Sequence, residues 1–357
     1  MSDNQLIKYF TPFLKPLGGG KSITQLLGEY RTPIMGLSMI LIMLYHQMWV
    51  TNDPISIWIH HLGYIGVEVF LLISGFGIAH SLSKNYLKTY YRNRVIRIFP
   101  ACVVWGSIKL FVSQLPNMPE CEANIMLELF SISSWYIYAC IVLYLLAPII
   151  YKVNSRYGWH TLFAISIVTF GIICIWHYNA DAPYLVEKGR WVFKRIPVFV
   201  MGMLIAQRPL NFKLYVTITI GFTALICNVL MIHYNIVLTA TGRPEKMLEE
   251  LVYNSPLRLD LPDGGRYLLD MLSALFIIPF FSGFSVLLDK IKMTPVLTFF
   301  GIYSLEIYLC HQYIFKVFLE NFSFNPYIEL TVSVCVSLFV AIIINNLANN
   351  IQLKLKN

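Results

Sequence analysis

The chain has 357 residues, of which 57% are hydrophobic and 13% are charged, whereas a typical globular protein has about 25% charged residues. Apolar stretches recur from Pro33 to Leu347 without a polar block large enough to fold separately, which excludes a water-soluble protein and predicts one membrane domain. The net charge of +8 would suit nucleic acid, but the basic residues lie at the ends of apolar segments, so we predict no nucleic-acid partner.

Residues 1–32 are predicted to be a polar cytoplasmic lead-in. Lys8, Lys15, Lys21 and a run of three glycines occupy the place where a cleavable signal peptide would have its apolar core. Six of the seven cysteines lie in apolar stretches, where they behave as small hydrophobic residues. The sequence therefore predicts a membrane domain over residues 33–350, a cytoplasmic tail over 351–357, and no disulfide framework.

Ten segments are long and apolar enough to span a bilayer, which requires about 20 mostly apolar residues. They are residues 33–49, 58–82, 98–115, 134–151, 159–176, 192–206, 214–233, 268–287, 296–315 and 327–347. The sixth is the weakest because it begins beside Lys194 and Arg195. This pattern predicts an all-α fold, a polytopic membrane helix bundle of about ten transmembrane helices.

The basic residues predict which side of the membrane each loop faces, because cytoplasmic loops carry more Lys and Arg. The two termini and the loops after even-numbered spans hold 17 of the 27 basic residues. The alternate loops hold 9, counting Lys194 and Arg195 at the start of the sixth span with them, and Lys109 lies inside the third span. Both termini are therefore predicted in the cytoplasm, and residues 243–258 outside. The long connection over 234–267 is either a lid or acceptor-binding element, or a solvated loop.

His46 and Glu68 are ionisable residues inside predicted spans, where such groups are costly and mark function. His46 lies roughly 20 Å above the cytoplasmic end of the first span, and Glu68 roughly 15 Å below the outer surface of a ~30 Å slab. The two residues thus have similar depths on adjacent helices. A carboxylate beside an imidazole fixes one tautomer and raises its basicity, as a general base requires; a polar contact that locks the helices together is the alternative.

Five cations follow the second span within fourteen residues: Lys84, Lys88, Arg92, Arg94 and Arg97. They could bind a polyanion such as the phosphates of a nucleotide cofactor, or anchor the topology against anionic lipid. Composition alone favours the anchor.

Five segments resemble, in order, the motifs of the acyltransferase-3 family of membrane O-acyltransferases. They are residues 66–76 (GVDxFFxxSGF, with Glu68 in the acidic place), 94–100 (RxxRIxP), 135–148 (WxLxxxxxLYLLxP), 195–202 (RxPxFxxG) and 301–311 (GxxSxxIYLxH). Each is degenerate alone, but together, on a ten-helix topology, they cover nearly the whole chain.

This resemblance implies transfer of an acyl group, expected to be acetyl, from cytoplasmic acyl-CoA to a hydroxyl of a surface or lipid-linked polysaccharide in the bacterial cytoplasmic membrane. It implies that His46, oriented by Glu68, is the general base or a transient acyl carrier, and that the phosphates of acyl-CoA bind a basic group. That group is Arg92, Arg94 and Arg97. Further candidate site residues that the motifs carry are His311, Tyr308, Ser304, Trp135 and Arg195.

The chain departs from the family pattern in two places. The first-helix signature has an arginine eleven residues before the histidine, where this chain has Met35; Arg31, one turn earlier on the same face, would substitute if the helix extends past Pro33. Many members also carry an extracytoplasmic hydrolase-like domain after the last helix, which is not expected here because residues 352–357 alone follow.

The sequence leaves two other functions open. A transporter or flippase with a His/Glu proton relay is the main alternative, although no inverted repeat with broken helices in matching positions is visible. A sensor related to acyltransferases but without catalysis is the third. No metal is expected, because the remaining histidines lack ligand spacing with carboxylates or cysteines.

Overall fold

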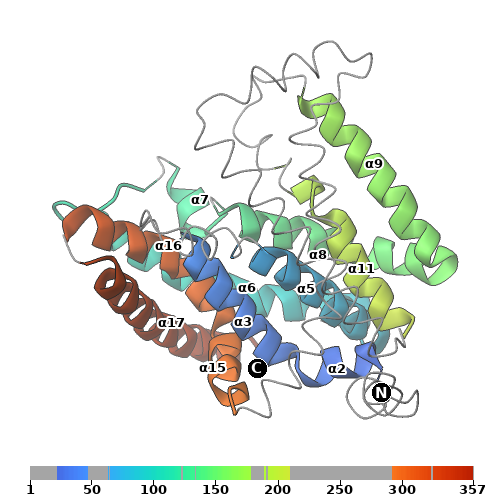
Figure 1. Cartoon of the computed structure of the whole chain (residues 1–357), viewed down its shortest axis with the longest axis horizontal. Helices are drawn as coiled ribbons and strands as arrows, with labels where there is room; N and C mark the ends of the chain where they lie inside the picture. The colour runs from blue at the N-terminus through green and yellow to red at the C-terminus, as the bar shows by residue number, and fades with distance from the viewer. Residues whose placement is uncertain are drawn as a thin grey trace, which may run out of the picture.

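The computed structural model describes residues 22–46, 63, 65–121, 124–132, 134–177, 189, 192–209, 292–322 and 325–356, and within these ranges the chain forms helices and no strand (Figure 1). The prediction of an all-α fold is confirmed to that extent. The helices are α2 (Ile23–Glu29), α3 (Arg31–His46), α5 (Ile65–Lys84), α6 (Leu87–Val112), α7 (Ile125–Leu129), α8 (Trp135–Tyr157), α9 (Trp159–His177), α11 (Ile196–Gln207), α15 (Thr294–Ile302), α16 (Ser304–Asn321) and α17 (Pro326–Lys356).

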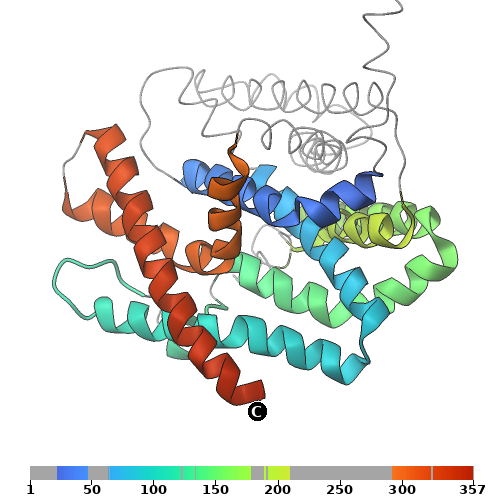
Figure 2. The ribbon, with the colours of Figure 1, turned by 90° about the horizontal axis from the view of Figure 1, so that it is seen from below.

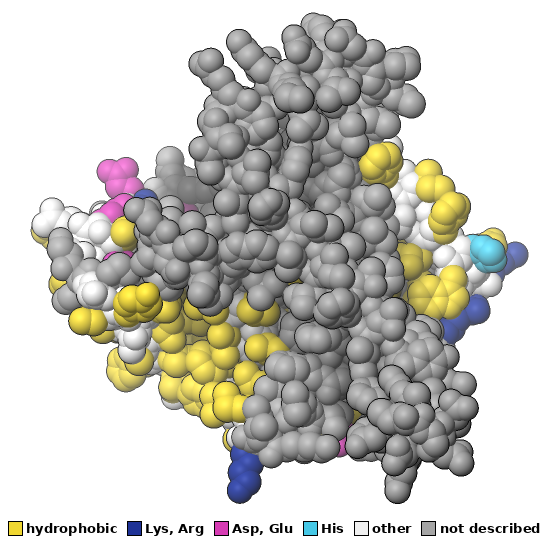
Figure 3. Space-filling model, in the orientation of Figure 1, with side chains coloured by type: hydrophobic (Ala, Val, Ile, Leu, Met, Phe, Trp, Pro, Cys, Tyr) yellow, Lys and Arg dark blue, Asp and Glu magenta, His cyan; other side chains and the backbone are white. Residues whose placement is uncertain are grey.

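Four of these helices, α5, α6, α8 and α17, are long and apolar enough to cross a membrane. Every predicted span outside residues 211–290 overlaps a helix; the seventh and eighth spans and the connection over 234–267 lie outside the described residues. Hydrophobic side chains gather over α15 and α17 with few charged ones among them (Figure 3), as suits a surface in contact with lipid. The number of ten spans and the side on which the termini lie stay predictions.

Two predicted boundaries are wrong. The third span was expected from residue 98, but α6 begins at Leu87, because a hydropathy window scores apolar content and not helix formation. The basic residues Lys88, Arg92, Arg94 and Arg97 therefore lie on a helix and not in a loop. The ninth span is divided at Tyr303 into α15 and α16. The glycine Gly301 brings α15 against α3, since a Cβ there would lie 2.0 Å from the backbone oxygen of Thr32, and α16 instead packs along α17.

Glycines let the central helices touch backbone to backbone. A Cβ at Gly202 of α11 would lie 2.0 Å from the Leu72 oxygen of α5, and one at Gly36 of α3 would lie 1.8 Å from the Leu297 oxygen of α15. Such close packing of small residues is the usual way in which membrane helices associate. Figure 2 shows α6 and α8 as a layer away from α3, with α17 crossing α6.

Candidate active site

Two histidines from opposite ends of the chain meet where α3 and α16 pack together. Nε2 of His311 lies 3.1 Å from Nδ1 of His46, and their ring centroids are 5.0 Å apart in an edge contact. His311 is fully buried, whereas His46, the last residue of α3, is half-buried. Both were predicted as site residues, and the structure brings them into direct contact.

The hydrogen-bond partners assign the protons of this pair. Nδ1 of His311 lies 3.0 Å from the Ile307 oxygen and 2.9 Å from the Tyr308 oxygen. Carbonyl oxygens only accept, so this nitrogen carries the proton and Nε2 of a neutral His311 carries the lone pair. Nδ1 of His46 therefore carries its proton, which lies between two acceptors, the Ile42 oxygen at 2.9 Å and Nε2 of His311 at 3.1 Å. The lone pair of His46 is left on Nε2, which is the atom a general base would use.

The expected pair of His46 and Glu68 is replaced by another. A carboxylate oxygen of Glu68 lies 2.8 Å from Nε of Arg195, and both side chains are 2% exposed. The Arg195 guanidinium also stacks 4.5 Å from the ring centroid of Trp135, the first residue of α8. A buried carboxylate is best balanced by a permanently charged arginine.

The reason for this difference is the direction in which Glu68 leaves its helix. Gly66 of α5 faces α3, because a Cβ there would lie 2.5 Å from the Ser38 oxygen. Glu68 lies two residues further, about 200° around the helix, on a different face from the one that meets α3. The sequence argument compared depths along the two helices, and depth carries no information about direction around the helix.

Aromatic rings line the approach to the histidine pair. The ring centroid of Tyr308 on α16 lies 5.5 Å from that of His311 and 4.4 Å from that of Tyr136 on α8. The predicted site residue Ser304 is buried at the first position of α16, two turns before His311. Tyr308 thus contacts His311. Trp135 and Arg195 contact one another, and among the described residues no contact of Trp135, Arg195 or Ser304 with the histidines is seen.

The three arginines predicted to bind acyl-CoA have different surroundings. Arg92 donates to the Leu355 and Lys356 oxygens at the end of α17, where free carbonyls attract a cation. Arg97 donates to Glu306, 3.1 Å away. Arg94 reaches a Ser81 hydroxyl at 3.5 Å and lies 5.9 Å from the Tyr90 ring centroid. Arg94 therefore keeps most of its donors for a ligand.

Arg31 begins α3, so the helix does extend past Pro33. Its guanidinium rests on α5, where a Cβ at Gly77 would lie 2.5 Å from Nη2. Arg31 interacts electrostatically with the like charge of Arg94. Within the described part of the chain Arg31 makes no hydrogen bond or ion pair. His46 is fifteen residues away, roughly 22 Å along α3, so Arg31 belongs with Arg94 and not with the histidines.

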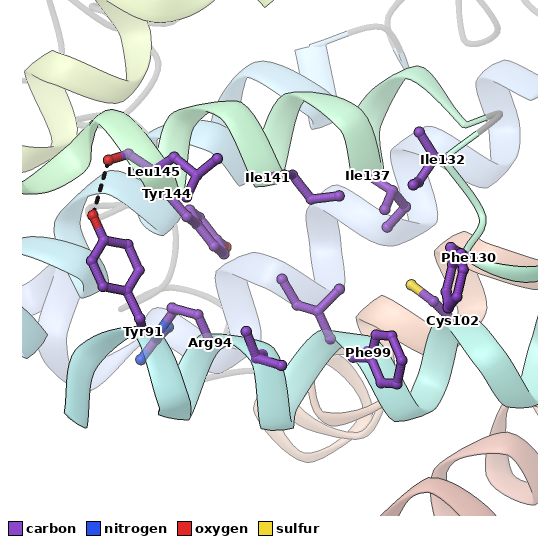
Figure 4. Close-up of a pocket in the computed structure, with 12 residues that line it drawn as sticks. Tyr91, Arg94, Phe99, Cys102, Phe130, Ile132, Ile137, Ile141, Tyr144 and Leu145 are labelled. Atoms are coloured by element: carbon purple, nitrogen blue, oxygen red, sulfur yellow. Dashed lines mark hydrogen bonds between the residues drawn. The ribbon is translucent and has the colours of Figure 1, made fainter. Parts of the chain in front are cut away.

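A groove of about 330 Å³ runs between α6 and α8 from Arg94 (Figure 4). Besides Arg94 and Tyr91 at one end, its walls are almost wholly apolar, with Phe99 and Ile137 along its length and Cys102 at the far end. An apolar channel that begins at a cation suits a ligand with an anionic head and a chain.

Two acidic residues escaped the sequence analysis. Glu306 of α16 is fully buried and accepts from Arg97 and from the Asn345 amide, and Glu128 lies 2.6 Å from Nζ of Lys109. Both could have been found, because a carboxylate within an apolar stretch requires a partner. Among the described residues no group of three or more metal-ligating side chains lies together, and the absence of a metal stays a prediction.

Comparison with known proteins agrees with the resemblance in the motifs. A family described as acyltransferase domain, acyltransferase-3, matches residues 36–346. Proteins of Staphylococcus aureus strains COL, MSSA476 and N315, each named "Putative O-acetyltransferase", are 25% identical over 332 residues, which cover 78% of this chain and 49% of theirs. The chain thus spans about half the length of these relatives. No solved structure matches it.

Proposed function

Because the chain belongs to the acyltransferase-3 family, we propose that it is an O-acyltransferase, which moves an acetyl group from acetyl-CoA to a hydroxyl of a surface or lipid-linked polysaccharide. The observation that carries the proposal is the contact of His46 with His311. It leaves the lone pair of His46 on Nε2, and an acceptor hydroxyl is a poor nucleophile unless a base removes its proton.

In the proposed reaction, Nε2 of His46 takes the proton of the acceptor hydroxyl while the oxygen attacks the thioester carbonyl. The carbon–sulfur bond then breaks, and the CoA sulfur leaves with the proton that His46 returns. The imidazolium that forms in between is stabilised by the lone pair of His311 at its Nδ1–H. A covalent route, in which Nε2 itself carries the acetyl group, would use the same atom.

The donor is proposed to approach from the end of the bundle that holds Arg31 and Arg94. Arg31 and Arg94 contribute two positive charges at this end, and a phosphate, which arginine binds through charge-assisted hydrogen bonds, would neutralise them. The groove between α6 and α8 gives the rest of acetyl-CoA an apolar path that begins at Arg94. We place this end on the cytoplasmic side of the bacterial cytoplasmic membrane, where acetyl-CoA is made.

The test is an assay of the full chain in lipid nanodiscs with acetyl-CoA and candidate glycans, which follows both thiol release and the mass of the glycan. Thiol release that depends on the glycan, with acetylated product, is expected. His46→Ala should lower the rate by about 10²- to 10⁴-fold while acetyl-CoA still binds. The matched control is His160→Ala, because His160 is exposed on α9. Near-normal turnover in a folded His46→Ala protein would refute the assignment of the base.

A further inference from the structure

A second cavity, of about 220 Å³, lies between α6, α7 and α16. Unlike the groove of Figure 4, its walls are largely polar. Trp105 and Lys109 come from α6, Glu128 from α7, Glu120 from the segment between them, and Tyr308 and Gln312 from α16. The helices α6 and α16 thus each contribute an aromatic ring and a polar group.

Some of these polar groups are already satisfied within the protein. Nζ of Lys109 donates to Glu128 at 2.6 Å, so this pair contributes little net charge. The amide of Gln312 and the carboxylate of Glu120 are exposed and make no hydrogen bond or ion pair within the described part of the chain. The amide of Gln312 can both donate and accept hydrogen bonds with a ligand, and the carboxylate of Glu120 can accept them.

The aromatic residues Trp105 and Tyr308 give one part of the otherwise polar cavity wall an apolar surface. Trp105 is 5% exposed and Tyr308 is 5% exposed, so each ring is held in place by the protein. A sugar ring has an apolar face of C–H groups and an edge of hydroxyls that both donate and accept. Aromatic walls beside an amide and a carboxylate match that combination of surfaces. The volume of about 220 Å³ is below the roughly 300–1,000 Å³ of sites for drug-sized ligands, so it suits a single small ring.

The cavity shares a wall with the histidine pair. Tyr308 lines it and has its ring centroid 5.5 Å from that of His311, and Gln312 follows His311 directly in α16. Along α6, Lys109 lies fifteen residues beyond Arg94, roughly 22 Å along the helix axis. The cavity and the arginine end of the groove therefore lie toward opposite ends of the bundle.

From this arrangement we propose that the cavity binds one uncharged sugar residue of the acceptor glycan and excludes anionic sugars. The inference rests on the proposed function, which it extends by assigning the acceptor subsite and its charge preference. Anionic sugars are excluded because of Glu120. Lys109 and Glu128 neutralise one another, so the carboxylate of Glu120 leaves the cavity with a negative charge. A uronic acid in the cavity would place a second carboxylate near it, and like charges at close range repel.

The test measures sugar binding directly, by saturation-transfer NMR on the full chain in nanodiscs without acetyl-CoA. The probes are methyl glycosides of neutral hexoses and of the matching hexuronic acids, which differ only in the charge at C6. We expect the best neutral hexoside to bind at least about tenfold more tightly than its uronic acid. Glu120→Gln should bring this ratio close to one, and Gln312→Ala should weaken both sugars by about three- to tenfold.

The matched control is Glu320→Gln, which also replaces a glutamate by glutamine. Glu320 is on α16, pairs with Lys316 and does not line the cavity. This variant should leave the binding ratio of neutral to anionic sugar unchanged. Equal binding of both sugar classes by the wild-type chain, no binding of any probe, or an unchanged ratio in Glu120→Gln would overturn the inference. Sugar binding without acetyl transfer would refute the proposed function and leave the cavity assignment intact. Acetyl transfer whose preference between neutral and anionic acceptors is unchanged in Glu120→Gln would support the proposed function and refute the cavity assignment.

Discussion

Nε2 of His311 lies 3.1 Å from Nδ1 of His46, and the two rings meet in an edge contact. His311 is in turn held by two backbone oxygens of its own helix, those of Ile307 and Tyr308. An orienting group fixed in this way defines the tautomer of its partner as a carboxylate would, but it adds no negative charge. The basicity of His46 therefore depends on a neutral partner.

The first prediction concerns His311 as a positioning residue. His311→Leu removes one of the two acceptors at Nδ1 of His46, the other being the Ile42 oxygen. The imidazolium therefore loses stabilisation, and we expect kcat/KM to fall roughly 10- to 100-fold. His311→Gln should restore part of this loss, because the amide oxygen can accept from Nδ1–H. The pH–rate profile is the deciding measurement: in His311→Leu the acid limb should move to lower pH. A protein that is merely unstable would lose active fraction and keep the limb where it is.

The second prediction concerns Glu68 and Arg195, which are 2% exposed and paired at 2.8 Å. Removing one partner of a buried ion pair costs about 3–5 kcal/mol, because the other charge is left behind. Glu68→Gln and Arg195→Met should each lower the thermal unfolding midpoint of the purified protein. The double variant should unfold at a higher temperature than Arg195→Met alone, because it removes both charges. A double variant as unstable as the sum of the two single ones would contradict the pairing.

The sequence identified the ionisable residues of the site but not their partners. A histidine and a carboxylate inside apolar segments are recognisable in the sequence, because burying an ionisable group in a membrane costs free energy and such groups are kept for function. The motif over residues 301–311 pointed to His311. The partners were not predictable in the same way, because which face of α5 meets α3 is decided by Gly66 and by the packing of α11. Glu68 thus pairs with Arg195.

The fold was predictable where hydropathy and helix coincide. The first and last predicted spans appear as α3 and α17 with shifts at their ends. Hydropathy missed the first three turns of α6, because residues 87–97 are polar enough to look like a loop. It also joined α15 to α16, since no apolar score detects a helix break at Tyr303.

The third prediction separates two arginines of one motif. Arg94 keeps donors for a ligand, so Arg94→Ala should weaken acetyl-CoA binding by about 10- to 100-fold, the range for a hydrogen bond to a charged group. Arg97 donates to Glu306, whose side chain is 0% exposed. Arg97→Ala should therefore lower stability by roughly 1–3 kcal/mol, on the lower side because Arg97 is 42% exposed.

Isothermal titration with acetyl-CoA and thermal unfolding should be measured on both variants of this pair. Lys88→Ala is the control, because Lys88 is an exposed cation on the first turn of the same helix. If Arg97→Ala weakens acetyl-CoA binding as strongly as Arg94→Ala does and leaves the unfolding midpoint unchanged, the division of roles is wrong.

The fourth prediction tests Arg31 without removing it. A Cβ at Gly77 would lie 2.5 Å from Nη2 and 2.8 Å from Cζ of Arg31. The guanidinium is the end of a flexible side chain, so in Gly77→Ala it moves while α5 stays. Acetyl-CoA affinity should fall several-fold if Arg31 binds a phosphate from its present place.

Double-mutant analysis makes the fourth prediction specific to this contact. Gly77→Ala should weaken acetyl-CoA binding in the wild-type background and have little further effect in Arg31→Ala, because the displaced group is already absent. Gly171→Ala is a suitable control, since a Cβ at Gly171 of α9 meets nothing within 4 Å. Equal effects of Gly77→Ala in both backgrounds would mean that the extra methyl group acts through the helix and not through Arg31, and the arginine end of the groove would lose one of its two cations.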